Sequence, residues 1–381
     1  RNDWSSTLPS SNRSFFYPSA NLSFIITDFL RSLDKTLPSW LTFAKVRLSA
    51  AQVGKDTEPY NLYNTLSYAF SNGVLNITKS DIKKNDQLKP EISSSYVNQG
   101  FEFMLYSTPV QTKDFTFDLN INLSRNVSKV KELADGVDYL FFNGDANFPI
   151  NVGTRVGHRL GEIYAKNLYK RDENGNMIVN KQGRPTKVSG EDAFQYTLDH
   201  PIGNIEPDLL MSVSPSFTYK GFTLSALFDM KFGGDIVSVS EAMATSTGLA
   251  ARTANRGNAE NGWKIVAPGV TADGTVNSTA MNAQRYYTSM SGMAEEFVYD
   301  ASFIKLKELS IGYNFPTKLL KKTPIQSLSV SFVARNLCYL LKHTPGTSPE
   351  GGYDTTMFSQ AIDYAALPYT RTFGLSVSLG F

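Results

Sequence analysis

Hydrophobic and small polar residues alternate without interruption over the last eleven positions of the chain, 371–381. Apolar side chains occupy every second position, and Gly or Ser occupies each position between them. The apolar set consists of Phe373, Leu375, Val377, Leu379 and Phe381. A period of two predicts a β-strand with one apolar face and one small, polar face.

The same alternation recurs upstream, and the chain as a whole predicts nine strands. These are residues 17–27, 43–53, 97–107, 115–125, 209–219, 222–233, 301–315, 328–340 and 371–381. In the stretch 115–125, the residues between the apolar positions include Asp118, Asn120 and Asn122. Such side chains are costly in a dry core, but they suit the water-filled interior of a membrane barrel whose apolar residues face lipid.

The connections between these strands alternate between short and long. The long ones run over about 54–96, 126–208, 234–300 and 341–370. Among the short ones, 107–114 and 219–221 are turns, whereas 27–42 and 316–327 have room for a helical turn. Inside one long connection, Asn174-Gly175 predicts a type I′ hairpin. Short turns on one side and long loops on the other are typical of outer-membrane barrels, and we expect the long loops to be extracellular.

The predicted fold class is therefore all-β, an antiparallel transmembrane β-barrel. The last strand of a bacterial barrel ends in the periplasm, and a complete barrel has an even number of strands. Nine strands place Arg1 on the opposite, extracellular side, although one miscounted strand would restore an even number. We therefore expect the C-terminal portion of a larger barrel, about 9–12 strands, that does not close on itself.

Composition supports a membrane barrel more than a soluble domain. Phe and Tyr are abundant, at 25 and 19 of 381 residues, while mean hydropathy is slightly negative. Lipid-facing strands with aromatic girdles give this combination. The net charge of +2 and the scattered Lys and Arg give no support for nucleic-acid binding. Cys338 is the only cysteine, which excludes an internal disulfide.

Several stretches resemble the C-terminal barrel half of the SusC/RagA family of TonB-linked outer-membrane transporters. They are SFTYKGFTLSALFDMKFGGDI (216–236), DASFIKLKELSIGYNFP (300–316), TPIQSLSVSFVARNLCYL (323–340) and the terminal RTFGL (371–375). Upstream, IGNIEPDL (202–209), AKVRLSAAQVGKD (44–56) and LKPE (88–91) also fit. The terminal aromatic Phe381 resembles the signal that the barrel-assembly machinery recognises in such proteins. The order is that of the family, and the coverage is nearly the whole chain.

This resemblance implies a portion of a barrel with about 22 strands. It implies TonB-dependent import of oligosaccharides or peptides across the outer membrane of a Gram-negative bacterium. The implied partners are a SusD-like surface lipoprotein and, through an N-terminal region that this sequence lacks, the TonB complex. The chain departs from the family between Glu91 and Asn98, where six residues stand in place of a strand pair. Either this member is short there, or the sequence omits residues of the protein.

Two other functions remain open on the sequence alone. One is a self-contained passive porin or an adhesive barrel, and the other is a soluble all-β binding domain. A plug and a TonB box in the gene would distinguish a transporter from a porin. A heat-modifiable band on a gel would distinguish a barrel from a soluble domain.

No group of residues predicts catalysis, a cofactor or a metal. His158, His200 and His343 are far apart and have no Cys partner, so a zinc site is not expected. The acidic stretch 172–176 lacks the Gly and Glu that a calcium loop needs at its sixth and twelfth positions. We expect a protein that is not an enzyme. Aromatic loop residues are the substrate-binding candidates: Trp263, Tyr286, Tyr287 and Tyr353. Packing of the loops onto each other is an equally good explanation for each of them.

Overall fold

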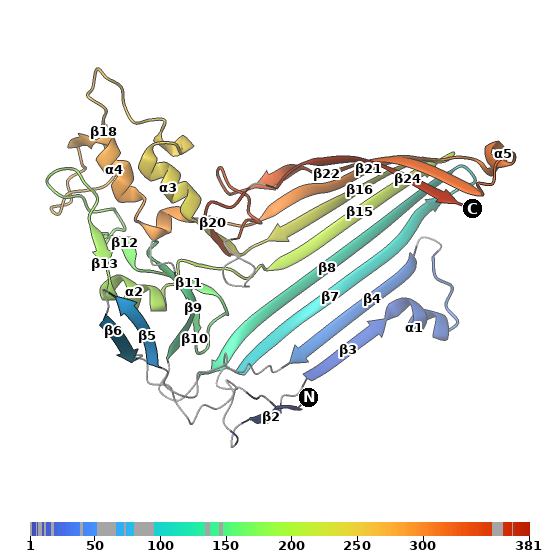
Figure 1. Cartoon of the computed structure of the whole chain (residues 1–381), viewed down its shortest axis with the longest axis horizontal. Helices are drawn as coiled ribbons and strands as arrows, with labels where there is room; N and C mark the ends of the chain where they lie inside the picture. The colour runs from blue at the N-terminus through green and yellow to red at the C-terminus, as the bar shows by residue number, and fades with distance from the viewer. Residues whose placement is uncertain are drawn as a thin grey trace.

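The computed structural model describes residues 2–4, 6, 10, 13–16, 19–38, 41–51, 66–71, 74–79, 95–133, 138–144, 148–352, 361–367 and 369–381. Its largest element is one antiparallel sheet of nine strands, ordered β24-β22-β21-β16-β15-β8-β7-β4-β3. Neighbours in the sheet follow one another among these nine strands along the chain, so the sheet is a meander that runs from β3 to β24 (Figure 1). The nine predicted strands are confirmed.

The bounds of the nine strands are close to the predicted ones. They are β3 (Ser19–Ile25), β4 (Leu41–Ala51), β7 (Ser95–Gln111), β8 (Phe115–Glu132), β15 (Leu209–Tyr219), β16 (Phe222–Phe232), β21 (Phe303–Asn314), β22 (Ser327–Lys342) and β24 (Thr372–Gly380). Two short connections contain the expected helical turn, α1 (Ile26–Ser32) and α5 (Thr317–Leu320). In the described residues β3 and β24 form the two edges of the sheet, which is open, as we expected.

The register between strands places most of the large apolar residues of β16, β21, β22 and β24 on one face. Leu224, Ile311, Phe332 and Leu375 are paired directly from β16 through β21 and β22 to β24. Directly paired residues lie on the same face of a sheet. Ile311, Phe332 and Leu375 are 53%, 48% and 72% exposed. This apolar face is therefore uncovered rather than packed in a core.

The opposite face is small and polar. The residues next to the apolar row in sequence are also paired across these strands, and they form a row on the opposite face: Thr223, Gly312, Ser331 and Ser376. A Cβ on Gly312 would lie 3.0 Å from the Ser331 Cβ, so this row tolerates only small residues. On β8 and β15, the Asn122 side-chain amide donates to the Ser212 hydroxyl at 3.2 Å. One apolar face and one polar face on a single layer are the two surfaces of a membrane barrel wall.

Two strands are longer than the sequence predicted, and in each the reason is local. β7 continues past Ser107, which had been expected to begin a turn, because a register shift between Ser107 and Val110 accommodates Pro109. Proline has no N–H to donate to the ladder, so a bulge is a position that tolerates it. β8 continues from 125 to 132, where both faces carry polar residues and the apolar alternation that reveals a membrane strand is absent.

The long connections fold together at one end of the sheet. We call the described residues 138–144, 148–208, 233–302 and 343–352 with 361–367 the loop domain; Figure 1 shows it beyond the ends of β15, β16 and β21. Its strands are β9 (Tyr139–Gly144), β10 (Ile150–Arg155), β11 (Glu162–Ala165), β12 (Asn167–Tyr169), β13 (Lys187–Ser189), β14 (Gly203–Asn204), β17 (Asp235–Ser238), β18 (Lys264–Val266), β19 (Ala280–Asn282), β20 (Val298–Asp300) and β23 (Ile362–Asp363). Its α-helices are α2 (Glu191–Asp199), α3 (Val239–Thr247) and α4 (Ala283–Met290), with 3-10 turns at 251–253 and 294–297.

One hydrophobic core joins all three connections of the loop domain. Ile150 and Ile163 come from the first, Val237 and Phe297 from the second and Ile362 from the third, and each is at most 3% exposed. The three-stranded sheet β20-β17-β23 pairs the second connection with the third. The Ser238 hydroxyl, which caps α3 by accepting from the Glu241 N–H, donates to Asp363 at 2.7 Å. These connections are therefore folded structure and not open loops.

The turn at 172–176 differs from its prediction. Gly175 donates its N–H to the Asp172 carbonyl at 3.0 Å and has φ of +81°. Asp172 donates to the Asn176 carbonyl at 2.9 Å, and Arg171 pairs with Met177. This is a three-residue hairpin loop that ends with glycine in the left-handed region, not the predicted type I′ turn. The Asp172 carboxylate favours it by accepting from the N–H groups of Asn174 and Asn176.

Two further pairs of strands lie outside the main sheet. β1 (Asn2–Trp4) pairs with β2 (Ser14–Phe16), and β5 (Leu66–Ser71) pairs with β6 (Val74–Lys79). The second pair belongs to the long connection 54–96, the rest of which lies mostly outside the described residues. No described helix is long and apolar enough to cross a membrane.

Candidate functional site

A cavity of about 540 Å³ lies where the polar face of the sheet meets the loop domain. Its volume is within the range of small-molecule and peptide side-chain sites. Strands β8, β15, β16 and β21 form one wall, and all three connections of the loop domain contribute to the other. The charged residues in its lining are Glu206, Asp229, Lys231, Asp235 and Glu350. A second hollow of about 300 Å³ shares Ser124, Leu210 and Asp229 with it and continues down the polar face.

A lysine of the sheet holds the third connection against this cavity. Lys305 lies opposite Asp229 in the register of β21 and β16, so it belongs to the polar face, and it is only 3% exposed. Its Nζ lies 2.6 Å from Glu350 Oε2 and over the rings of Tyr339 and Tyr369, at 5.2 and 4.8 Å from their centroids. Tyr339 donates its hydroxyl to the same Glu350 oxygen at 2.5 Å. The charge of Glu350 is thus satisfied twice from the barrel wall.

Three more ion pairs border the cavity. Lys307 Nζ lies 2.6 Å from Asp229 Oδ2, across the bulge between β21 and β16. Within the loop domain, Arg159 lies 3.2 Å from Asp208 and 3.8 Å from Glu206. Asp235 lies at the start of β17, where its carboxylate accepts the N–H of Asn204 at 2.8 Å. Lys231 on β16 is the remaining cationic side chain of the lining.

Burial changes the acidity of the carboxyls on the loop-domain side. It raises the pKa of Asp235, and the nearby carboxylate of Asp300 adds to this, whereas the Asn204 N–H and Lys231 oppose it. Burial also raises the pKa of Glu206, against hydrogen bonds from Ser128 and the charge of Arg159. The pKa of Glu241, beneath Arg252 in the loop-domain core, is raised by burial as well. All three groups are therefore more stable protonated than they would be in water.

We expect the stability of the loop domain to fall as pH rises, and Asp235→Asn to flatten this dependence. A carboxyl whose pKa is raised in the folded state stabilises the fold fully below its ordinary pKa, 3.8 for Asp. That contribution is lost as the pH rises through the folded-state value. Asparagine keeps the acceptor for Asn204 without a charge. Thermal unfolding of both proteins between about pH 4 and about pH 7 measures the slopes. A steeper slope in the variant would contradict the assignment, and Asp114→Asn, at the exposed turn between β7 and β8, is the matched control.

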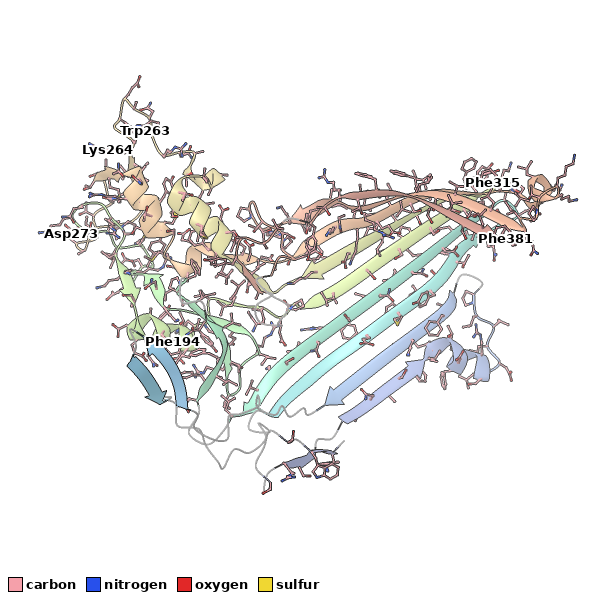
Figure 2. The ribbon with its side chains drawn as sticks, in the orientation of Figure 1. Phe194, Trp263, Lys264, Asp273, Phe315 and Phe381 are labelled. Carbon is pink, nitrogen blue, oxygen red and sulfur yellow. The ribbon has the colours of Figure 1, made fainter. Side chains whose placement is uncertain are left out.

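The predicted binding aromatics differ in their surroundings. Trp263 is 49% exposed and lies at the outer tip of the loop domain, away from the sheet, as Figure 2 shows. Tyr286 and Tyr287 on α4 are 7% and 8% exposed and pack in a cluster with Met281. The Tyr287 hydroxyl donates to the Arg252 carbonyl at 3.1 Å, and burial raises the pKa of Tyr286 to about 12.

The packing explanation therefore describes Tyr286 and Tyr287 in this structure. Neither presents an open ring to a ligand, and their binding role stays a prediction. Tyr353 lies outside the described residues. Phe381 is 75% exposed at the opposite end of the sheet, beyond the last residue of β24 (Figure 2). The structure does not test its role as an assembly signal.

Sequence reasoning missed Lys305 and Glu350, which are 45 residues apart. The one available signal is the run IKLKEL (304–309), where lysines lie between the apolar residues Ile304 and Leu306 and beyond them, in place of the small polar residues that occupy these positions in other strands. His158 Nδ1 lies 3.1 Å from Glu162 Oε1 within the loop domain. Among the described residues, no group of three or more His, Cys, Asp or Glu side chains could hold a metal ion.

Comparison with known proteins shows that the chain is similar to TonB-dependent receptors. It is 27% identical over 302 residues to TonB-dependent receptor P3 of Formosa agariphila. This alignment covers 74% of this chain and 28% of that protein. It is 27% identical over 312 residues to TonB-dependent receptor SusC of Bacteroides thetaiotaomicron, or 78% of this chain and 27% of that protein. No family model matches. The chain thus spans between a quarter and a third of the length of these relatives.

Solved structures share the fold. A structure of the RagAB peptide transporter superimposes on the whole chain with a TM-score of 0.65 and 17% identity, over 45% of its own chain. The RagAB peptide importer in its open-open state superimposes with a TM-score of 0.63 and 19% identity. The resemblance to SusC/RagA-type TonB-dependent transporters is therefore confirmed in sequence and in fold. The expected fold class, an antiparallel sheet that is part of such a barrel, is confirmed with it.

Proposed function

We propose that this chain forms part of the wall and the external loops of an outer-membrane channel for TonB-dependent nutrient uptake. One observation carries the proposal: nine strands in register separate an uncovered apolar face from a polar face. The apolar face suits lipid, and the polar face suits a water-filled lumen. The relatives named as TonB-dependent receptors favour energised uptake over the alternative of a passive porin.

The loop domain would lie on the extracellular side, and it gives this channel a place to receive cargo. Its cavity opens at the junction with the polar face, so a molecule held there would lie at the mouth of the lumen. The cargo class we propose is oligosaccharide or peptide, because paired charges and aromatic rings serve both. We propose further that a SusD-like surface lipoprotein covers the loop domain, and that the chain itself has no enzymatic activity. RagAB is a peptide transporter, so peptide is one of the two cargo classes to test.

Trp263 is the residue of the loop domain that we expect to contact cargo or the lipoprotein. It is a large aromatic side chain at the exposed tip, and its φ of +54° is a conformation that few residues adopt readily. Trp263→Asn removes the indole but suits a positive φ. Loss of an exposed aromatic anchor weakens binding by about 2 kcal/mol, which is roughly 30-fold.

The measurement is uptake of labelled oligosaccharide and peptide mixtures by cells, together with co-purification of the lipoprotein. Val276→Asn is the matched control, because Val276 is also exposed, at 76%, in the same part of the loop domain. We expect Trp263→Asn to lower uptake or capture and Val276→Asn to leave both unchanged. If the two variants behave alike, this surface has no binding role. Uptake that continues without TonB would favour the passive porin.

A further inference from the structure

We propose that the hairpin end of the sheet, opposite the loop domain, binds the headgroups of anionic phospholipids through a cluster of lysines. The cluster is Lys318, Lys321 and Lys322, in the connection that contains α5. We call it the lysine rim. This inference rests on the proposed membrane location, and it adds a lipid partner that the transport function does not require.

An aromatic row fixes where the membrane surface would lie. Phe115, Tyr219, Phe222 and Tyr313 are paired directly across β8, β15, β16 and β21 on the apolar face. They are the last apolar-face residues before the hairpin turns at this end. The rings of Phe222 and Tyr313 are 4.5 Å apart, and those of Tyr313 and Phe315 are 5.0 Å apart. Such a row is a girdle at the level of the lipid headgroups.

The lysine rim lies directly beyond this girdle in the sequence. Phe315 is the first residue after β21, and Lys318 is three residues farther on. Figure 1 shows α5 projecting at this extreme end of the sheet, and Figure 2 places Phe315 and Phe381 beside it. All three lysines are exposed. Between them, Leu319 is 68% exposed while Leu320 is buried against the turn. An exposed leucine among lysines suits a headgroup layer that is apolar on one side and charged on the other.

Within the connection that contains α5, no acidic residue balances the lysine charge. Residues 315–327 contain three lysines and no Asp or Glu. The adjacent hairpin between β15 and β16 adds Lys220, whose Nζ lies 5.4 Å from the centre of the Tyr219 ring in the girdle. A basic cluster beside a membrane surface attracts anionic lipid with about 1 kcal/mol for each Lys. Phosphodiester headgroups are the anions that this position meets, so we commit to anionic phospholipid.

Lipid retention tests the proposal. The protein is extracted from outer membranes in mild detergent and incubated with equal amounts of phosphatidylglycerol and phosphatidylethanolamine, and bound lipid is measured by native mass spectrometry. We expect the wild type to prefer phosphatidylglycerol. The triple variant Lys318→Gln, Lys321→Gln and Lys322→Gln should lower that preference by about tenfold or more. The matched control replaces Lys170, Lys181 and Lys187, exposed lysines of the loop domain, with Gln.

Two results would overturn the inference, and a third would contradict the proposed function. An unchanged preference in the rim variant would show that the lysines do not bind lipid. An equal loss in both triple variants would show an effect of total charge and not of the rim. A protein that is absent from the outer-membrane fraction in all three forms would instead contradict the proposed function. Heat-modifiability of the rim variant, measured on the same samples, confirms that it has folded.

Discussion

An arginine placed on the apolar face should destabilise the folded protein far more than one placed a single residue away on the polar face. We expect Ile311→Arg to lower the free energy of unfolding by about 1–3 kcal/mol in a lipid bilayer, because the cost is largest at the midplane and Ile311 lies one apolar-face position inside the girdle residue Tyr313. Ile311 is paired with Leu224 and Phe332 on the apolar face of β21, and it is 53% exposed. In water this exposure would make the substitution harmless, so the cost arises from lipid. Unfolding titrations in lipid vesicles measure it.

Ser310→Arg is the matched control on the same strand. Ser310 pairs with Ser225 and faces the opposite side, so we expect its cost to be within about 0.5 kcal/mol. The comparison controls for total charge and for the strand that carries the arginine, because each variant adds one arginine to β21. Equal costs would mean that the two faces meet the same medium. That outcome would remove the main support for a membrane barrel.

The strands could be predicted because each of them repeats one simple rule over many residues. Residues 371–381 alternate without interruption because lipid lies on one side and water on the other. Prediction failed where that condition ends. In 126–132 polar residues occupy both faces, so the sequence did not predict that β8 continues to Glu132. At Ser107 a bulge extended a strand that Pro109 had seemed to end.

The loop domain could not be predicted in the same way. Its strands are only two to six residues long, and its core combines residues as distant as Ile150 and Ile362. No periodic pattern survives in segments so short. The burial of Tyr286 and Tyr287 follows from this, because the α4 face that carries them is covered by residues of other strands. An exposed position such as Trp263 could be proposed from sequence, but it could not be distinguished from its buried neighbours.

The contact between Lys305 and Glu350 should be the strongest single attachment of the third connection to the barrel wall. Removing one partner of a buried ion pair leaves an uncompensated charge, at a cost of about 3–5 kcal/mol. Lys305 and Glu350 side chains are only 4% and 21% exposed. We therefore expect Glu350→Ala to loosen residues 343–352 from the sheet. Hydrogen exchange of this segment and unfolding titrations together measure the loss.

Two further variants distinguish the unpaired charge from lost packing. Adding Lys305→Met to Glu350→Ala removes the buried charge, so we expect most of the stability to return, as buried pairs can often be replaced by apolar residues. Glu308→Ala is the matched control, because it breaks the exposed pair between Glu308 on β21 and Arg335 on β22. The side chains of Arg335 and Glu308 are 63% and 36% exposed, so we expect a cost of at most about 1 kcal/mol. If Glu350→Ala costs no more than Glu308→Ala, Glu350 does not fix this connection. If it costs more, the cavity keeps its shape because a carboxylate of the third connection neutralises the lysine in its wall.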